Sequence, residues 1–222
     1  ADASARASSS VLARVWAWFR VAFRGATRDR GSAGSSTQPV FRSTPPMSPP
    51  RLFIFDWDGT LTDSVARIVG CLGSAAREIG LRVRSETAYG EVIGLGLPEV
   101  IRRLYPELSE DIAGVYRDRY AAHFIAADTE PSAFFPGALE ALHVLRARGH
   151  LLAVATGKSR RGLDRVLGCH GLEGFFDATR CADETASKPD PRMLTEIFAE
   201  LGTDPADSLV VGDTEFDMEM AA

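Results

Sequence analysis

Carboxylates, hydroxyls and lysines follow the short apolar segments of this 222-residue chain. The groups are Asp56-Trp57-Asp58-Gly59-Thr60 after LFIF, Thr156-Gly157-Lys158 after LLAVA, Ser187-Lys188-Pro189 before a helical pattern, and Gly212-Asp213 with Asp217 after LVV. In an open parallel sheet, ligand sites form beyond the carboxyl ends of the strands. We therefore expect these four groups to converge at one edge of a sheet.

Four of these side chains are aspartates, namely Asp56, Asp58, Asp213 and Asp217. Carboxylates held close together repel one another, and such a cluster is stable only with a bound cation or with shifted pKa values. Hard oxygen ligands without His or Cys favour Mg²⁺, which binds through a few carboxylates and a substrate phosphate. We therefore expect all four aspartates to belong to a magnesium site.

The remaining groups suit a phosphate. Lys188 supplies positive charge, Thr156 supplies a hydroxyl donor, and the backbone at Gly157 can approach a phosphate closely. In an extended segment, side chains two residues apart point the same way. Asp56 and Asp58 can therefore both reach one phosphoryl centre.

The apolar pattern after residue 50 predicts an α/β fold. Short continuous apolar runs, typical of buried parallel strands, occur at residues 52–55, 151–155 and 209–211. We expect a further strand at residues 176–181. Segments with helical spacing alternate with the later runs. This alternation predicts a doubly wound, Rossmann-like parallel sheet.

Residues 64–133 have no strand of comparable strength. Their apolar spacing predicts a helix over 65–79 and two or three helices within 85–127. We therefore expect an all-helical cap at 64–133, inserted into a core made of residues 51–63 and 134–222. Asp213 lies nine residues before the last residue, where a further strand would normally follow. We therefore also expect the C-terminal part of the core to be truncated.

Residues 1–50 differ from the rest, with seven Arg, no Lys and two acidic residues. Their Ser, Gly, Thr and Pro content predicts a disordered extension. Residues 11–23 are the exception, because their apolar residues have helical spacing. That segment fits an interfacial amphipathic helix or a transit peptide. The alternative is a non-native extension before a true start at Met47.

Composition excludes several classes of protein. The formal charge of −5, with 45% apolar and 25% charged residues, is ordinary for a globular chain and gives no reason to expect nucleic-acid binding. No apolar run is long enough for a stable membrane span. Three cysteines without a CxxC pair argue against disulfides or structural zinc and fit a cytoplasmic protein. The oligomeric state stays open.

The sequence resembles the haloacid dehalogenase-like (HAD) superfamily, in particular its phosphoglycolate phosphatase-like branch with a helical cap. The resemblance covers residues 51–222 and rests on DWDGTLTD at 56–63, VATGK at 154–158, SKPDP at 187–191 and VGDTEFDM at 211–218. It implies that Asp56 is a nucleophile that becomes an aspartyl phosphate and that Asp58 is the general acid and base. It further implies that Thr156 and Lys188 hold the transferring phosphoryl group. It implies that Mg²⁺ is bound by the side chains of Asp56 and Asp213 and by the backbone carbonyl of Asp58, with Asp217 as a further acidic residue at the metal.

Two residues narrow the function within the superfamily. Asp58 argues against dehalogenases and phosphonoacetaldehyde hydrolases, which lack the second aspartate. Gly157 stands where the branch more often has Asn, which weakens the assignment of a substrate class. We predict a Mg²⁺-dependent hydrolase of a small phosphate monoester, with phosphoglycolate as the default substrate. The alternatives are a phosphomutase, or a non-catalytic binding protein or inactive fragment if the chain truly ends at residue 222.

Other polar residues near the motifs have simpler interpretations. Asp63 or Ser64 could cap the helix over 65–79, and we interpret Asp63 as a cap and not as a catalytic group. Lys158 fits a phosphate contact and a surface position equally well. Arg102 and Arg103 fit a solvated helix face better than a substrate contact. Trp57 is expected to pack beneath the site or the cap.

Overall fold

The computed structural model describes residues 50–127 and 131–222. Apart from Pro50, the extension expected at 1–50, including its helix at 11–23, lies outside the described residues. In the described part, no helix is both long and apolar enough to cross a membrane.

The core is a sheet of four parallel strands in the order β3-β2-β1-β4. The strands are β1 (Leu52–Phe55), β2 (Leu151–Thr156), β3 (Ala178–Cys181) and β4 (Ser208–Val211). Phe55, the last residue of β1, pairs with Val154 and Val211. Because the strands run parallel and in register, the residues that follow them emerge at one edge of the sheet.

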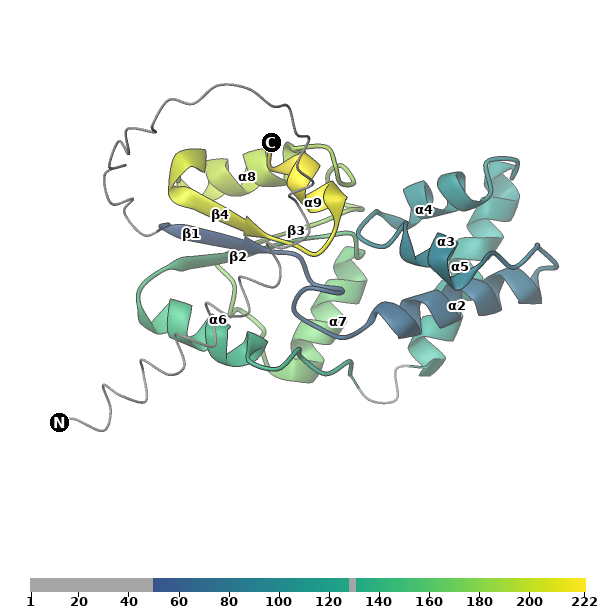
Figure 1. Ribbon diagram of the computed structural model, residues 1–222, viewed down its shortest axis with the longest axis horizontal. Coiled ribbons are helices and arrows are strands. Elements are labelled where there is room, and N and C mark those ends of the chain that lie inside the picture. Colours follow the sequence, from purple (N-terminus) through teal and green to yellow (C-terminus); the bar gives the residue numbers. More distant parts are fainter. Residues whose placement is uncertain (1–49, 128–130) are drawn as a thin grey trace, which may run out of the picture.

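Helices cover both faces of the sheet (Figure 1). Helices α6 (Ala138–Ala147) and α7 (Arg160–His170) lie on one face, and α8 (Arg192–Leu201) and α9 (Glu215–Met220) lie on the other. Alternate side chains of β1 enter opposite cores, with Phe53 and Phe55 on the α6–α7 side and Leu52 and Ile54 on the α8–α9 side. The predicted doubly wound, Rossmann-like fold is confirmed.

The described residues between β1 and α6 form four helices with a separate apolar core. They are α2 (Val65–Glu78), α3 (Glu86–Gly90), α4 (Leu97–Leu104) and α5 (Glu110–Ala127), and they stand beside the carboxyl edge of the sheet (Figure 1). The two connections to the core lie side by side, since Asp63 N–H donates to Ala133 O at 2.9 Å and Phe135 N–H to Leu61 O at 3.0 Å. We propose these connections as the boundary between core and cap.

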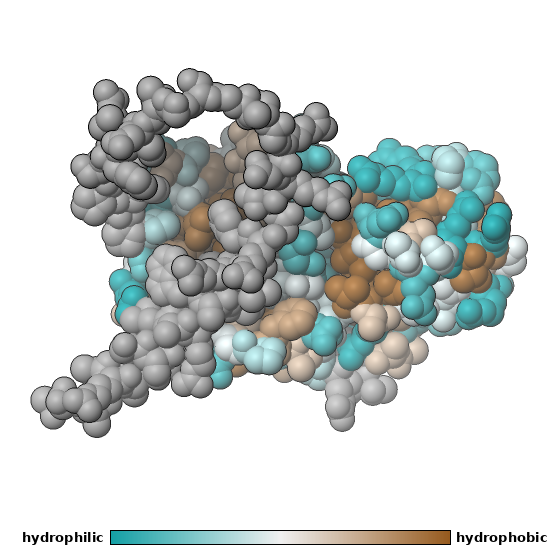
Figure 2. All heavy atoms as spheres, in the orientation of Figure 1, coloured by the Kyte–Doolittle hydropathy of each residue, from teal (hydrophilic) through white to brown (hydrophobic). Residues whose placement is uncertain are grey.

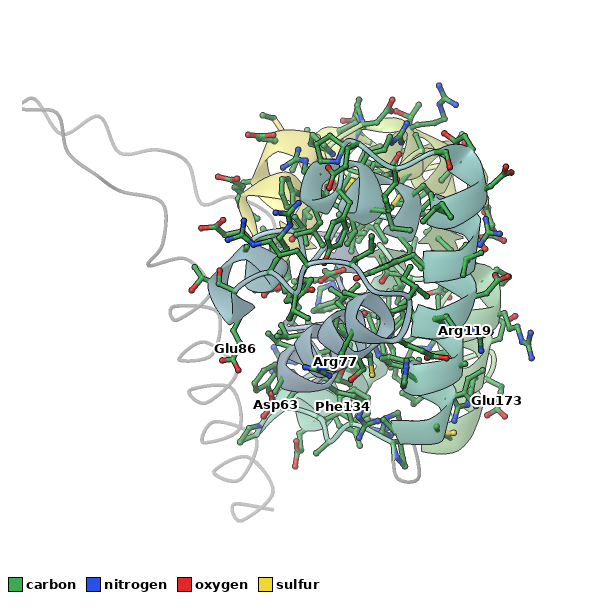
Figure 3. All side chains as sticks on the ribbon, turned by 90° about the vertical axis from the view of Figure 1, so that its right-hand side faces the viewer. Asp63, Arg77, Glu86, Arg119, Phe134 and Glu173 are labelled. Carbon is green, nitrogen blue, oxygen red and sulfur yellow. The ribbon has the colours of Figure 1, made fainter. Side chains whose placement is uncertain are left out.

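The interpretation of Asp63 as a helix cap is wrong. Helix α2 begins at Val65, its N-cap residue is Ser64, and neither side chain caps the helix. Asp63 is exposed and lies beside Phe134 at the junction (Figure 3). Ser64 is buried, and its hydroxyl points to the site described next.

Candidate active site

Asp56 and Lys188 form a buried ion pair beyond the end of β1. Lys188 Nζ lies 2.6 Å from Asp56 Oδ1 and 2.6 Å from Asp217 Oδ1, and all three residues are buried. One lysine thus faces two buried carboxylates, which leaves excess negative charge in a place that water does not reach. The pKa of Asp56 is raised to about 8, mainly because burial disfavours its charged form. The positive charge of Lys188 lowers this pKa, and the negative charges of Asp217 and Asp213 raise it further. Although burial alone lowers the pKa of Lys188, the two carboxylates raise it above its ordinary value.

A third carboxylate completes a group suited to a cation. Oxygen atoms of Asp56, Asp213 and Asp217 lie within 4.8 Å of one another. Within the described part of the chain, Asp56 Oδ2 is buried without a hydrogen-bond partner. The Thr60 hydroxyl donates to Asp213 Oδ1 at 2.8 Å and orients this more exposed carboxylate. A hard divalent cation such as Mg²⁺ fits this set, because it prefers carboxylate oxygen and would satisfy the unpartnered atom.

Glycines allow these carboxylates to come so close. A Cβ on Gly59 would collide with the carboxylate of Asp213, and a Cβ on Gly212 would collide with that of Asp217. The two glycines of the DWDGT and GDTEFD motifs are therefore required for space around the site.

Asp58 has a different environment from the other three aspartates. Its Oδ1 accepts a hydrogen bond from Ser64 Oγ at 2.6 Å and lies 2.9 Å from Lys158 Nζ. The carboxylate is not part of the cation group. The metal role that we predicted for Asp58 therefore rests on its backbone carbonyl.

Lys158 belongs to the site and not to the surface. Its side chain is only 9% exposed, and Nζ lies 5.1 Å from the ring centre of Phe124 on cap helix α5. Lys158 therefore connects Asp58 of the core to the cap. The sequence places Lys158 near the site, two residues after Thr156. It does not show that Phe124 of the cap covers the side chain, and this contact is what excludes a solvent-exposed position.

Thr156 and Gly157 occupy the end of β2. Thr156 is fully buried, and its hydroxyl accepts a hydrogen bond from Lys158 N–H at 3.2 Å. A Cβ on Gly157 would lie 2.5 Å from Leu95 O of the cap. The missing side chain is therefore what lets the cap segment at 94–96 lie on the core, where Gly96 N–H donates to Ser187 Oγ at 2.7 Å.

The substitution Gly157→Ala should force this cap segment away from the core. A clash of this kind costs about 1–3 kcal/mol, so we expect kcat/KM to fall by roughly 5- to 150-fold. Steady-state kinetics with any hydrolysed ester would measure the loss. Gly70→Ala is the matched control, because no atom lies within 4 Å of a Cβ there. Equal activity of the two variants would contradict the close approach.

Magnesium should stabilise the folded chain. A ligand present at 100 times its Kd adds about 2.7 kcal/mol to the free energy of unfolding. Thermal melts in Mg²⁺ and in EDTA should therefore differ for the wild-type chain. The difference should largely vanish in Asp213→Asn and persist in Asp207→Asn, whose side chain is exposed outside the site. An unchanged magnesium shift in Asp213→Asn would argue against this site.

The described residues thus combine a Rossmann-like sheet, a helical segment beside its carboxyl edge, and a group of carboxylates and lysines between them. A family model described as haloacid dehalogenase-like hydrolase matches residues 50–222, and the chain belongs to this family. It is 35% identical to the probable phosphatase IndB of Dickeya dadantii, over 77% of this chain and 76% of that protein. It is 34% identical to a phosphoglycolate phosphatase of Agrobacterium fabrum, over 76% and 74% of the two chains.

A solved structure has the same fold. The crystal structure of a predicted phosphoglycolate phosphatase from Haemophilus somnus superimposes with a TM-score of 0.70 at 25% identity, covering 79% of this chain and 82% of that one. The resemblance to a phosphoglycolate phosphatase-like HAD protein is thereby confirmed, as is the enzyme class.

Proposed function

We propose that the chain hydrolyses a small phosphate monoester through an aspartyl phosphate on Asp56. The observation that carries this proposal is the buried carboxylate of Asp56. Its Oδ1 is bound by Lys188, its Oδ2 has no hydrogen-bond partner among the described residues, and oxygen atoms of Asp213 and Asp217 lie within 4.8 Å of this carboxylate. A carboxylate is a weak nucleophile, and a phosphate dianion repels it. The site offsets part of this repulsion with the positive charge of Lys188, which lies 2.6 Å from the other oxygen of Asp56, Oδ1.

In the first step, an oxygen of Asp56 attacks phosphorus and the bond from phosphorus to the alcohol oxygen breaks. Asp58 gives its proton to the departing alcohol. In the second step, Asp58 takes a proton from water, whose oxygen attacks phosphorus, and the bond to Asp56 breaks. Inorganic phosphate leaves, and both aspartates return to their starting states.

Lys188, Thr156 and the backbone at Gly157 would hold the transferring phosphoryl group. Lys158 would join them, because a phosphate dianion competes with Asp58 for its ammonium group. Ser64 would keep the Asp58 carboxylate in place throughout.

Mg²⁺ would be held by the side chains of Asp56 and Asp213 and by the backbone carbonyl of Asp58, with Asp217 beside it. When bound, it supplies positive charge to the phosphoryl oxygens and to the nucleophile. The cap would exclude bulk water from the reacting groups. The named phosphatase relatives support phosphoglycolate as the first metabolite to test.

Hydrolysis of p-nitrophenyl phosphate by the full chain tests this proposal. Phosphate release should require Mg²⁺ and stop in EDTA. Phosphoglycolate and other phosphorylated metabolites would then be compared. Folded chain that releases no phosphate from any of these esters would overturn the proposal.

A further inference from the structure

The cavity above the active site is larger and more apolar than a two-carbon acid requires. It has a volume of about 520 Å³, within the range of about 300–1,000 Å³ that holds drug-sized ligands. Asp56, Asp58 and Lys158 line its wall on the core side. Most of the remaining wall is hydrocarbon. Figure 2 shows apolar surface where the cap borders the core.

The apolar wall comes from two parts of the cap. Residues 92–95 contribute Val92, Ile93 and Leu95, which are buried among the cap helices and line the cavity. Helix α5 contributes Phe124 and Ile125, one turn beyond Tyr120. Phe124 also lies near Lys158, so hydrocarbon begins directly beside the phosphate end of the cavity.

Three arginines among the described residues line the cavity. Arg117 and Arg161 are exposed, and Arg117 is paired with Asp118 at 3.5 Å. Arg165 is half-buried and already has an interaction partner. The buried ammonium groups at the phosphate end are already held, Lys158 by Asp58 and Lys188 by Asp56 and Asp217. A carboxylate on the alcohol part of a substrate would lose its water in this cavity. Because both buried lysines are already paired with aspartates, the lost hydration would not be replaced by an ion pair, and binding would cost free energy.

We infer that the preferred substrates are phosphate monoesters of an apolar alcohol, whose hydrocarbon body lies against residues 92–95 and helix α5. The inference rests on the proposed phosphatase function and names the class of its leaving group. It places phosphoglycolate among the weaker substrates. Binding energy comes from burial of the hydrocarbon body, which grows with its length.

Two homologous series of esters test the inference in the presence of Mg²⁺. The first contains n-alkyl phosphates from ethyl to hexyl, and the second carries a carboxylate in place of the terminal methyl, beginning with phosphoglycolate. The alkanols of the first series are similar leaving groups. Differences in kcat/KM among these esters therefore report burial of the alkyl chain and not differences in chemical reactivity. We expect kcat/KM to rise by roughly a factor of four per methylene in the alkyl series. Each carboxylate member should be at least about tenfold poorer than its alkyl partner.

A pair of variants on α5 locates the hydrocarbon body. Ile125 and Ile112 are 50% and 42% exposed, and of the two only Ile125 lines the cavity. Ile125→Lys should flatten the alkyl series and improve the carboxylate series by up to about fivefold, the upper range for an exposed ion pair. Ile112→Lys should behave like the wild-type chain.

The outcomes separate this inference from the function on which it rests. A flat alkyl series, a preference for carboxylates, or equal behaviour of the two variants would overturn the inference while the phosphatase stands. No magnesium-dependent hydrolysis of any ester, p-nitrophenyl phosphate included, would overturn both.

Discussion

Replacing Asp56 with Asn should abolish hydrolysis, with kcat lowered by at least about 10⁴-fold. The amide has nearly the shape of the carboxylate but lacks the charge and the nucleophilic oxygen that attack phosphorus. The measurement is the release of phosphate from p-nitrophenyl phosphate in Mg²⁺ by purified wild-type and variant chains.

Two comparisons keep this result interpretable. Asp63→Asn changes an exposed aspartate of the same sequence motif and should leave kcat unchanged. The Asp56→Asn chain should unfold at the same or a higher urea concentration, because the substitution removes charge from a buried group whose pKa is raised to about 8. Activity above roughly one per cent of wild type would show that Asp56 is not the nucleophile.

Replacing Lys188 with Met should destabilise the chain by about 3–5 kcal/mol, the cost of breaking a buried ion pair from one side. Asp56 and Asp217 would then share a buried site with no cation between them. Urea unfolding in EDTA at neutral pH measures the loss. We expect kcat/KM to fall by about 10²–10³-fold as well, because a fixed charge on the phosphoryl group is lost.

A second substitution separates charge from packing in this prediction. Asp217→Asn added to Lys188→Met removes one of the two unpaired carboxylates, so it should restore part of the lost free energy of unfolding. Activity should not return, because the phosphoryl group still lacks its lysine. A double variant no more stable than Lys188→Met alone would mean that packing, and not charge, sets the cost.

The parallel sheet and the residues at its carboxyl edge could be predicted from the sequence, because both follow from the local pattern of apolar and polar residues. Continuous apolar runs such as LFIF can only be buried, and their parallel pairing carries the following residues to one edge. Asp56, Asp213, Asp217 and Lys188 therefore meet as expected, although far apart in the chain. Their catalytic roles stay predictions.

The contacts between cap and core could not be predicted in this way. The position of Lys158 depends on Phe124, and the need for Gly157 depends on the carbonyl of Leu95, both on the cap. Such contacts are decided by how the cap helices pack on the core. The spacing of residues in the sequence gives no information about this packing. The role of Ser64 could not be predicted for a similar reason, since its hydroxyl donates to the Asp58 carboxylate and does not cap its own helix.

The most direct test of the account is to trap the phosphorylated aspartate. Sodium borohydride reduces an acyl phosphate to an alcohol, which converts a phosphorylated aspartate to homoserine. The chain would be mixed with p-nitrophenyl phosphate and Mg²⁺, treated with borohydride, digested and analysed by mass spectrometry. We expect homoserine at residue 56 and unchanged aspartate at residues 58, 213 and 217. Homoserine at another position, or none at residue 56 while ester is being hydrolysed, would contradict the assignment of Asp56 as the nucleophile.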